Sequence, residues 1–186
     1  MRDTGAHSAI LSRALAELGT IDLAIIAHGI LGDHLKARSD YSEAEDILRT
    51  NFLSVVSLVT WLAEYFEDSH QGTLAVISSI SAVRGRASNY VYASSKAGLN
   101  VFLDGVRHRL YRHGVHVLTI LPGFVLTPMT EHLPQSFLAA TPARIAPRIL
   151  AAVVRRKDVL YTPAFWSAIM FIVRMIPRWI FKSLDL

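Results

Sequence analysis

The chain has 186 residues, of which 52% are apolar, so it is long enough to form one globular domain with a real core. It contains no cysteine, which excludes disulfide bonds and thiolate metal sites. The net charge of +4 comes from dispersed basic residues without a recognition motif, so we expect no nucleic-acid partner. The eight histidines show no metal-ligand spacing such as HExxH, and we expect no metal site.

The first predicted elements alternate between helices and a buried strand. Residues 3–19 have helical periodicity, with Asp3 or Thr4 as the N-cap and a glycine just past the end. Residues 21–29 form a continuous apolar run that ends at a glycine, which is typical of a strand covered on both faces. Residues 42–66 return to helical periodicity. This order favours an α/β fold.

The middle of the chain continues the alternation. The helix over 42–66 is predicted to begin with a capping box formed by Ser42 and Glu45. A short buried strand over 73–79 follows, then a helix over 90–112, and then a strand over 115–123 that ends at Pro-Gly.

The last part of the chain adds one helix and one strand before an apolar terminal segment. Residues 141–156 are predicted to be a helix with proline at its first position, and residues 158–163 a fourth strand. The apolar segment 164–182 is predicted to be a terminal helix that is too short and too interrupted by charge to span a membrane. We therefore expect one domain over 1–186, built on a doubly wound parallel sheet of the Rossmann type.

The region around Tyr92 holds a pattern with a chemical meaning. Lys96 follows Tyr92 by four residues, the spacing YxxxK, so both side chains lie on one face of the predicted helix. A tyrosine is a poor acid–base catalyst at neutral pH because its pKa is near 10, but a nearby ammonium favours the phenolate and lowers that pKa. Ser79 lies at the carboxyl end of the second predicted strand, where a hydroxyl can hydrogen-bond to a carbonyl oxygen awaiting reduction.

Three segments resemble the motifs of the short-chain dehydrogenase/reductase family. They are ISS (77–79), YASSK (92–96) and LPGFVLT (121–127). The resemblance covers nearly the whole chain and implies an oxidoreductase that reduces a ketone with hydride from NADP or NAD. The substrate is then a small-molecule or lipid-linked ketone.

The resemblance also implies a role for each catalytic residue. Ser79 polarises the substrate carbonyl, Tyr92 transfers the proton, and Lys96 lowers the Tyr92 pKa and holds the nicotinamide ribose. Asn51 supports a proton relay; it is a polar amide in an apolar helix, which must find a partner or carry a cost. Tyr90 is interpreted as a packing or substrate-side residue, because no lysine follows it by four residues.

The same resemblance implies a set of cofactor-binding residues, with His28 included by position only because the family's Asn-Asn-Ala-Gly is Ile-Ala-His-Gly here. The set is His28, Gly29, Tyr92, Lys96, Pro122, Gly123, Val125 and Thr127. The alternative for Pro122 and Gly123 is a tight turn that only leaves a strand. Ser78 and Ser81 are weaker alternatives to Ser79, whose offset from the tyrosine matches the family.

Within the family, AHGILGD and the terminal apolar segment resemble the decaprenylphosphoryl keto-pentose reductases, which implies a 2-keto sugar on a polyprenyl phosphate as substrate. The aromatic residues of 164–182, with Arg174 and Arg178 on another face, suit the surface of a membrane. They equally suit packing against a second subunit. We expect a cytoplasmic homo-oligomer, and peripheral contact with the inner membrane stays open.

The printed sequence departs from the family at its beginning, because it contains no TGxxxGxG turn. Counting back from Gly29 places Asp3 after the family's third strand, so we expect the first three strands to be lacking and Met1 to be an internal start or the edge of a fragment. The chain alone is then expected to bind dinucleotide weakly or not at all and to associate through an exposed apolar strand. A catalytically silent paralogue that acts only through subunit or membrane association is the competing hypothesis.

Overall fold

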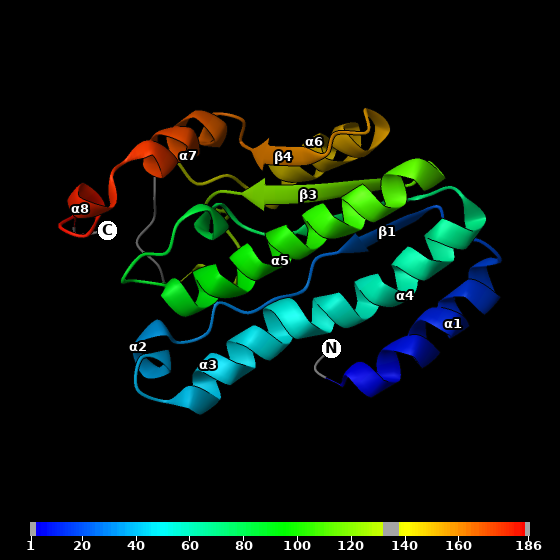
Figure 1. The fold of residues 1–186 in the computed structure, drawn as a ribbon, viewed down its shortest axis with the longest axis horizontal. Coiled ribbons are helices and arrows are strands. Elements are labelled where there is room, and N and C mark those ends of the chain that lie inside the picture. Colours follow the sequence, from blue (N-terminus) through cyan, green and yellow to red (C-terminus); the bar gives the residue numbers. More distant parts are fainter. Residues whose placement is uncertain (1–2, 132–137, 185–186) are drawn as a thin grey trace.

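The computed structural model describes residues 3–131 and 138–184, so Met1 lies outside the described residues (Figure 1). Within them, four parallel strands form one sheet in the order β1-β2-β3-β4. The strands are β1 (Leu23–Ile26), β2 (Thr73–Ile77), β3 (His116–Pro122) and β4 (Val159–Thr162). Each strand lies within the apolar run that predicts it, so the expected parallel α/β sheet is confirmed.

Helices cover both faces of this sheet (Figure 1). They are α1 (His7–Leu18), α2 (His34–Ala37), α3 (Tyr41–Leu48), α4 (Ser54–Ser69), α5 (Tyr90–Leu110), α6 (Pro142–Val154), α7 (Trp166–Met175) and α8 (Arg178–Phe181). Single turns of 3-10 helix lie at Thr4–Ala6, Ile80–Val83 and Tyr111–His113, and a π-helical turn lies at Arg49–Leu53. The larger core lies between the sheet and α1, α4 and α5, where Phe66 and Leu103 are fully buried against Leu74.

Helix α6 packs on the opposite face of the sheet. Ala152 of α6 is buried against Ala75, Leu118 and Ile120, which alternate along β2 and β3 with residues that face the larger core. The doubly wound arrangement is therefore confirmed. Because β4 extends the sheet in the same direction as β2 and β3 while α6 lies on the other face, this crossover has the opposite hand to the two before it.

The helical run predicted over 42–66 is observed as α3, the π-helical turn and α4, but its capping box is wrong. Helix α3 begins at Tyr41, and the Asp40 carboxylate accepts hydrogen bonds of 2.9 Å from the Ser42 backbone N–H and 2.7 Å from the Ser42 hydroxyl. Glu45 pairs with Arg49 one turn later, at 3.0 Å. An aspartate just before the first turn is as good an N-cap as serine, and here Asp40 directly precedes the helix whereas Ser42 lies inside it.

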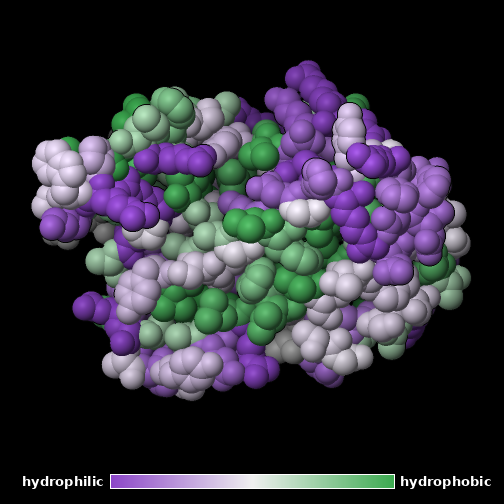
Figure 2. All heavy atoms as spheres, viewed as in Figure 1, coloured by the Kyte–Doolittle hydropathy of each residue, from purple (hydrophilic) through white to green (hydrophobic). Residues whose placement is uncertain are grey.

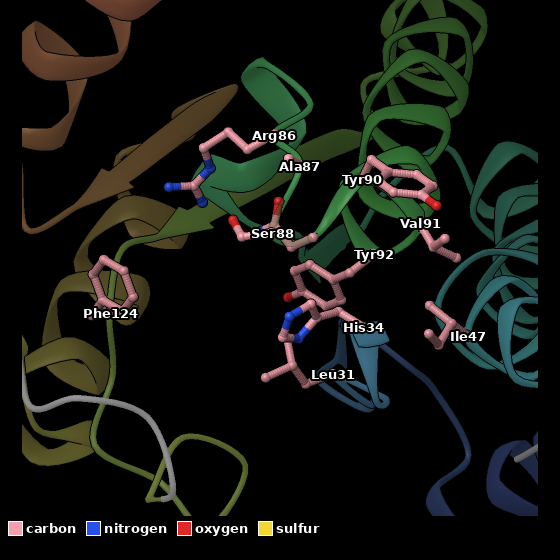
Figure 3. Close-up of a pocket in the computed structure, with 11 residues that line it drawn as sticks. Leu31, His34, Ile47, Arg86, Ala87, Ser88, Tyr90, Val91, Tyr92 and Phe124 are labelled. Atoms are coloured by element: carbon pink, nitrogen blue, oxygen red, sulfur yellow. The ribbon is translucent and has the colours of Figure 1, made fainter. Parts of the chain in front are cut away.

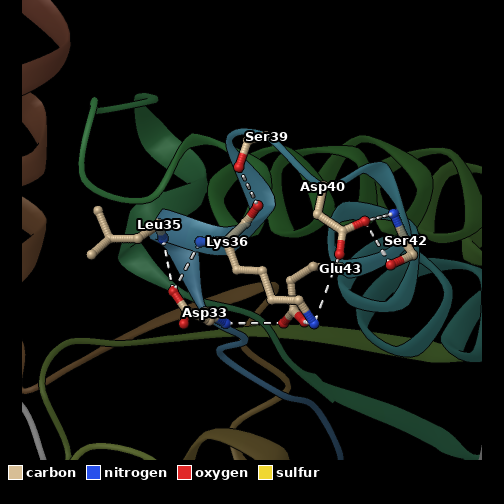
Figure 4. A network of polar contacts seen from close by, with 7 residues as sticks. All are labelled: Asp33, Leu35, Lys36, Ser39, Asp40, Ser42 and Glu43. Carbon is tan, nitrogen blue, oxygen red and sulfur yellow. Dashed lines mark hydrogen bonds and ion pairs between the residues drawn. The ribbon is translucent and has the colours of Figure 1, made fainter.

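The loop between β1 and α3 is held by a network of polar contacts (Figure 4). Asp33 caps α2, and its backbone N–H donates to Glu43 at 3.0 Å. Lys36 pairs with the same glutamate at 3.3 Å. Gly32 has φ +70°, and a Cβ atom there would lie 2.4 Å from the Ile47 side chain, so only glycine fits. This network fixes the segment that follows β1 at the edge of the site.

The predicted single helix over 164–182 is wrong, because the segment forms two helices, α7 and α8. Ile176 adopts an extended conformation before Pro177, as residues before proline do, and the helix stops there. Arg84 donates to the carbonyls of Val173 and Ile176 at 2.8 and 2.5 Å, and so takes up acceptors at the end of α7. Among the described residues, no helix is long and apolar enough to cross a membrane.

The start of α7 is packed directly on the turn after β3. A Cβ atom on Gly123 would lie 1.9 Å from Nε1 of Trp166, whose side chain is 5% exposed. Such a distance is impossible without a rearrangement of the indole. The glycine therefore permits contact between the terminal segment and the carboxyl end of β3.

We predict that Gly123→Ala lowers the free energy of unfolding by about 1–3 kcal/mol, because the added methyl group overpacks against Trp166. Gly105→Ala is the matched control. Gly105 lies inside α5 with nothing within 4 Å of its position for a Cβ atom, so alanine there is expected to stabilise by about 0.5–1 kcal/mol. Urea unfolding of both variants measures the difference. Equal effects would contradict the close approach at Gly123.

Candidate active site

The carboxyl ends of β1, β2 and β3 open into one cavity of about 370 Å³, which is closed by α5, by α6 and by the segment after β3. The predicted residues that line it are His28, Gly29, Ser79, Tyr92, Lys96, Pro122, Gly123, Val125 and Thr127. Asn51, the remaining predicted residue, contacts the loop after β1 from behind the cavity wall. Ligands of open α/β sheets bind beyond the carboxyl ends of the strands, and the structure brings the predicted residues together at that edge.

The side chains of Ser79, Tyr92 and Lys96 meet at the start of α5. Ser79 caps the start of the 3-10 turn after β2, and its Oγ accepts a hydrogen bond of 3.1 Å from the Ser81 backbone N–H. Because α5 begins at Tyr90, Tyr92 and Lys96 lie on one helix face, with the Lys96 ammonium 6.0 Å from the centre of the Tyr92 ring. Lys96 is only 3% exposed and donates to the carbonyl of Ile77, at 3.2 Å.

The pKa of Tyr92 is shifted upward, which is opposite to the direction predicted. Burial raises the pKa of the Tyr92 phenol, and the neighbouring Ser79 hydroxyl lowers it by a smaller amount through a hydrogen bond. The expectation that Lys96 brings this pKa down is not met, because removal from water dominates. The phenol therefore keeps its proton at neutral pH, as a proton donor in a reduction must.

Lys96 is a cation that the fold has removed from water. Burial lowers the pKa of its ammonium to about 8. Among the described residues no carboxylate forms an ion pair with it, and the Ile77 carbonyl is its hydrogen-bond acceptor. An ammonium has three N–H donors, so donors remain for a ligand in the cavity that it lines.

Asn51 lies in the π-helical turn and is completely buried. Its amide donates to the carbonyl of Ile30 and accepts from the N–H of Ile30, both at 2.8 Å, and it also donates to Ser95 at 3.3 Å. The polar amide expected to need a partner thus holds the loop after β1 against α5. Single π-helical turns occur often at functional sites, because they redirect one side chain out of the helical register. The proton-relay role of Asn51 stays a prediction.

Gly29 creates room where the loop after β1 crosses these residues. A Cβ atom on Gly29 would lie 3.0 Å from Oδ1 of Asn51 and 3.5 Å from Nζ of Lys96. A side chain there would fill the space in front of the free ammonium donors. A nicotinamide nucleotide fits this arrangement, because its ribose hydroxyls can accept from Lys96 and its ring can lie against backbone that has no side chain.

His28 is oriented by a short chain of hydrogen bonds. Its Nε2 lies 2.6 Å from the hydroxyl of Ser54, which donates its own proton to the carbonyl of Thr50 at 2.7 Å. Nε2 must therefore be the donor, which assigns the tautomer and leaves Nδ1 as an acceptor. Burial and the nearby Lys96 charge lower the pKa of His28, so the neutral form prevails at neutral pH. The cavity wall thus offers one acceptor beside the ammonium.

The segment after β3 and helix α6 contribute lining residues that were not predicted from the sequence. The further lining residues on this side are Met129, Thr130, Pro142, Ile145, Ala146 and Ile149. Thr130 donates to the carbonyl of Val125 at 2.5 Å and accepts from the N–H of Thr127 at 3.2 Å, so it closes the turn that presents both residues to the cavity. The order Thr-Pro-x-Thr after the strand was the available signal, because threonine and proline favour such turns.

Comparison with known proteins agrees with this geometry. Residues 1–136 match the model of the short chain dehydrogenase family. An uncharacterized oxidoreductase of Mycobacterium tuberculosis is 37% identical over 182 residues, which cover 98% of this chain and 73% of the relative. A 3-oxoacyl acyl-carrier-protein reductase of Vibrio cholerae is 31% identical over 137 residues, which cover 74% of this chain and 56% of the relative. The chain therefore belongs to the short-chain dehydrogenase/reductase family, whose members are NAD(P)-dependent oxidoreductases.

The fold comparison gives the same class. A short chain dehydrogenase from Burkholderia cenocepacia, crystallised with NADP, superposes with a TM-score of 0.83 and covers 100% of this chain and 76% of its own. The sequence identity of 21% means that this likeness establishes the Rossmann-like fold alone.

We predict that Lys96→Met raises stability at pH 7, since the shift from 10.5 to about 8 corresponds to a cost on the order of 3 kcal/mol for the buried charge. The sign follows from the lowered folded-state pKa. The cost is complete below pH 8 and disappears above about pH 10.5, where the unfolded chain also loses the proton.

The measurement is thermal unfolding of Lys96→Met and of the unchanged chain from pH 7 to pH 11. The stabilisation is expected to shrink across that range. Lys157→Met, which removes an exposed lysine, is the matched control and is expected to leave stability unchanged at pH 7. A lower Tm for Lys96→Met at pH 7 would contradict the prediction that the buried charge of Lys96 destabilises the folded protein.

Proposed function

We propose that this chain catalyses the reduction of a ketone at the cavity lined by Ser79, Tyr92 and Lys96, with NADPH or NADH as reductant. The observation that carries the proposal is the meeting of a serine hydroxyl, a protonated phenol and an unpaired ammonium in front of a glycine at the carboxyl edge of the sheet. General acid catalysis on a carbonyl needs a donor at its oxygen and a charge that stabilises the donor's conjugate base.

Each residue then has one task. Ser79 and Tyr92 donate hydrogen bonds to the carbonyl oxygen, and Tyr92 gives up its proton as that oxygen becomes an alcohol. The phenolate left behind is stabilised by the Lys96 ammonium, which the fold keeps unpaired among the described residues. When bound in this cavity, the dihydronicotinamide supplies the hydride that the carbonyl carbon takes.

The cofactor is held by residues on two sides of the cavity. Lys96 would donate to the ribose hydroxyls, a ribose hydroxyl would donate to Oη of Tyr92, and His28 lies on the same wall of the cavity. Val125 and Thr127, from the segment after β3, would contact the carboxamide. Assays of the chain use millimolar cofactor, so that the site is saturated even where its affinity is low.

The finer proposal is that the ketone is a 2-keto sugar on a polyprenyl phosphate and that the enzyme meets this lipid at a membrane surface. Helices α7 and α8 support it, since Phe171, Ile172 and Trp179 are 63–70% exposed there. Arg174 and Arg178 lie on the same two helices. Figure 2 shows hydrophobic and hydrophilic residues side by side around these helices, at the upper left. A surface of this composition suits an anionic membrane interface.

A homo-oligomer in the cytoplasm completes the proposal. Strand β1 lies at the edge of the sheet, and Leu23 and Ile25 on one of its faces are 37% and 45% exposed. An apolar edge strand of this kind favours association.

We predict that Tyr92→Phe lowers NADPH-dependent turnover of a ketone by about 10²–10⁴-fold, because the proton donor is lost. Binding of NADPH, followed by its fluorescence at millimolar concentration, is expected to change little. Tyr111→Phe is the control, because Tyr111 is 79% exposed at the far end of α5. Turnover by Tyr92→Phe at the unchanged rate would refute the assignment. No turnover by the unchanged chain at saturating cofactor would favour the silent paralogue.

We predict that Phe171→Ser with Trp179→Ser lowers cosedimentation with vesicles of anionic lipid by about tenfold or more, because two exposed aromatic side chains leave the interface. Tyr111→Ser removes an equally exposed aromatic residue elsewhere and is the control. Unchanged vesicle binding together with a smaller oligomer in light scattering would identify the face as a subunit interface instead.

A further inference from the structure

A second pocket opens beside Tyr92, which lines both this pocket and the predicted cofactor cavity (Figure 3). Its volume of about 340 Å³ is within the range of small-molecule sites. Tyr92, Leu31 and Phe124 form part of its wall, and Arg86 lies at its rim with the guanidinium directed toward the side of Phe124. The pocket therefore adjoins the place where a ketone would meet Tyr92.

A smaller cavity of about 110 Å³ joins this pocket to the catalytic hydroxyls. Ser79 and Tyr92 line it together with Ser81, Arg86 and Asn89. The catalytic pair and the arginine thus face one space, which is too small for a whole ligand and suits one part of it. A single substrate that occupies both spaces touches Tyr92 and Arg86 at the same time.

Several of the polar groups around this space are donors. The Arg86 guanidinium and the Asn89 amide each donate to the hydroxyl of Ser81 at the long distance of 3.4 Å. Within residues 3–131 and 138–184, the Ser81 hydroxyl donates to no acceptor, so its proton is available to a ligand. Three kinds of N–H or O–H donor therefore converge, and the one unpartnered acceptor beside them, Oδ1 of Asn89, is buried and carries no charge.

The charge of Arg86 has no counterion in the part of the chain that the structure describes. None of its ion pairs involves Arg86, and neither cavity is lined by an aspartate or a glutamate. Burial lowers the pKa of this half-buried guanidinium, which nevertheless stays charged in proteins. A partly desolvated cation of this kind gains most from an anion that accepts two of its N–H groups.

Arg84, two residues earlier, shows what an engaged arginine looks like in the same segment. It donates to two carbonyls at 2.8 and 2.5 Å and lies over the ring of Phe181 at 3.8 Å. Among the described residues, the hydrogen bond that Arg86 forms is the 3.4 Å contact with Ser81. The hydrogen bonds of Arg84 stabilise the fold, whereas most N–H groups of Arg86 are available to a ligand.

We propose that Arg86, with Ser81 and Asn89, binds an anionic group on the ketone substrate, so that the enzyme selects ketones that carry a phosphate or a carboxylate. This inference rests on the proposed ketone reduction for its catalytic consequence but not for the binding itself. The anion lies on the Ser79 side of the substrate, and the rest of the molecule extends into the larger pocket toward Tyr90 and Val91.

The test compares matched ketones with and without the charge, on the whole chain at millimolar NADPH. Dihydroxyacetone phosphate is paired with dihydroxyacetone, and acetoacetate with ethyl acetoacetate. For Arg86→Met, kcat/KM for the preferred anionic ketone is expected to fall about 10–100-fold, while kcat/KM for its neutral partner stays within about twofold. Arg86→Lys is expected to recover part of the loss, because it keeps the charge without the planar fork.

Arg112→Met is the matched control, because Arg112 is exposed at the opposite end of α5. It is expected to leave both members of each pair unchanged. The pair that responds to Arg86→Met identifies the anion as phosphate or carboxylate. Equal losses for anionic and neutral ketones, or no loss for either, would overturn the proposal.

Calorimetric titration separates this inference from the proposed function. Dihydroxyacetone phosphate and acetoacetate are each titrated into the unchanged chain and into Arg86→Met, without turnover. Binding of either anion that weakens about tenfold or more in Arg86→Met supports the anion site even if the chain reduces no ketone. If the chain reduces neutral ketones but neither anion binds in a way that depends on Arg86, the anion site is refuted. The proposed function is then still supported.

Discussion

The buried ammonium of Lys96 is the feature on which the rest of the site depends. A cation without a carboxylate partner is costly to hold in a protein interior, and burial lowers the pKa of this one to about 8. Its position is set by the Ile77 carbonyl at the end of β2 and by the rigid helix α5. The glycine at position 29 leaves its free donors accessible, and Asn51 holds the loop that carries this glycine. The sheet, the helix and the loop thus together position one charge that has no ion-pair partner among the described residues.

The segment between β2 and α5 connects this charge to the remainder of the molecule. It carries Ser79 at its start, Arg84 in the middle and Arg86 two residues later. Arg84 has an extended backbone and reaches the end of α7, so the terminal helices are attached to the same segment that presents the catalytic serine. A disturbance of α7 and α8 is therefore expected to reach the position of the Ser79 hydroxyl. The terminal helices thus contact the segments around the catalytic site at two places, through Arg84 at the end of α7 and through Trp166 against Gly123 at its start.

Much of this could be predicted from the sequence, because apolar runs define buried strands and the carboxyl ends of parallel strands meet at one edge. That rule brings Ser79, Tyr92 and Lys96 together from their spacing alone. The direction of the Tyr92 pKa could not be obtained in this way, because it depends on how far the phenol is removed from water. The break at Pro177 was present in the sequence, but the apolar run around it obscured the helix end. The different roles of Arg84 and Arg86 depend on which acceptors the fold brings near each of them.

The reversed hand of the last crossover accounts for the wall that the segment after β3 forms together with α6. Because α6 lies on the face of the sheet opposite to α5, the chain after β3 passes across the carboxyl edge before it reaches α6. On the way, Leu126 and Phe124 form hydrogen bonds with Ala140 at 2.9 Å, which holds this segment over the cavity. The segment therefore separates the predicted cofactor cavity from the pocket beside Phe124, and Tyr92 lines both. A proton donor between two pockets can face the reductant on one side and the substrate on the other, which is the arrangement a reductase requires.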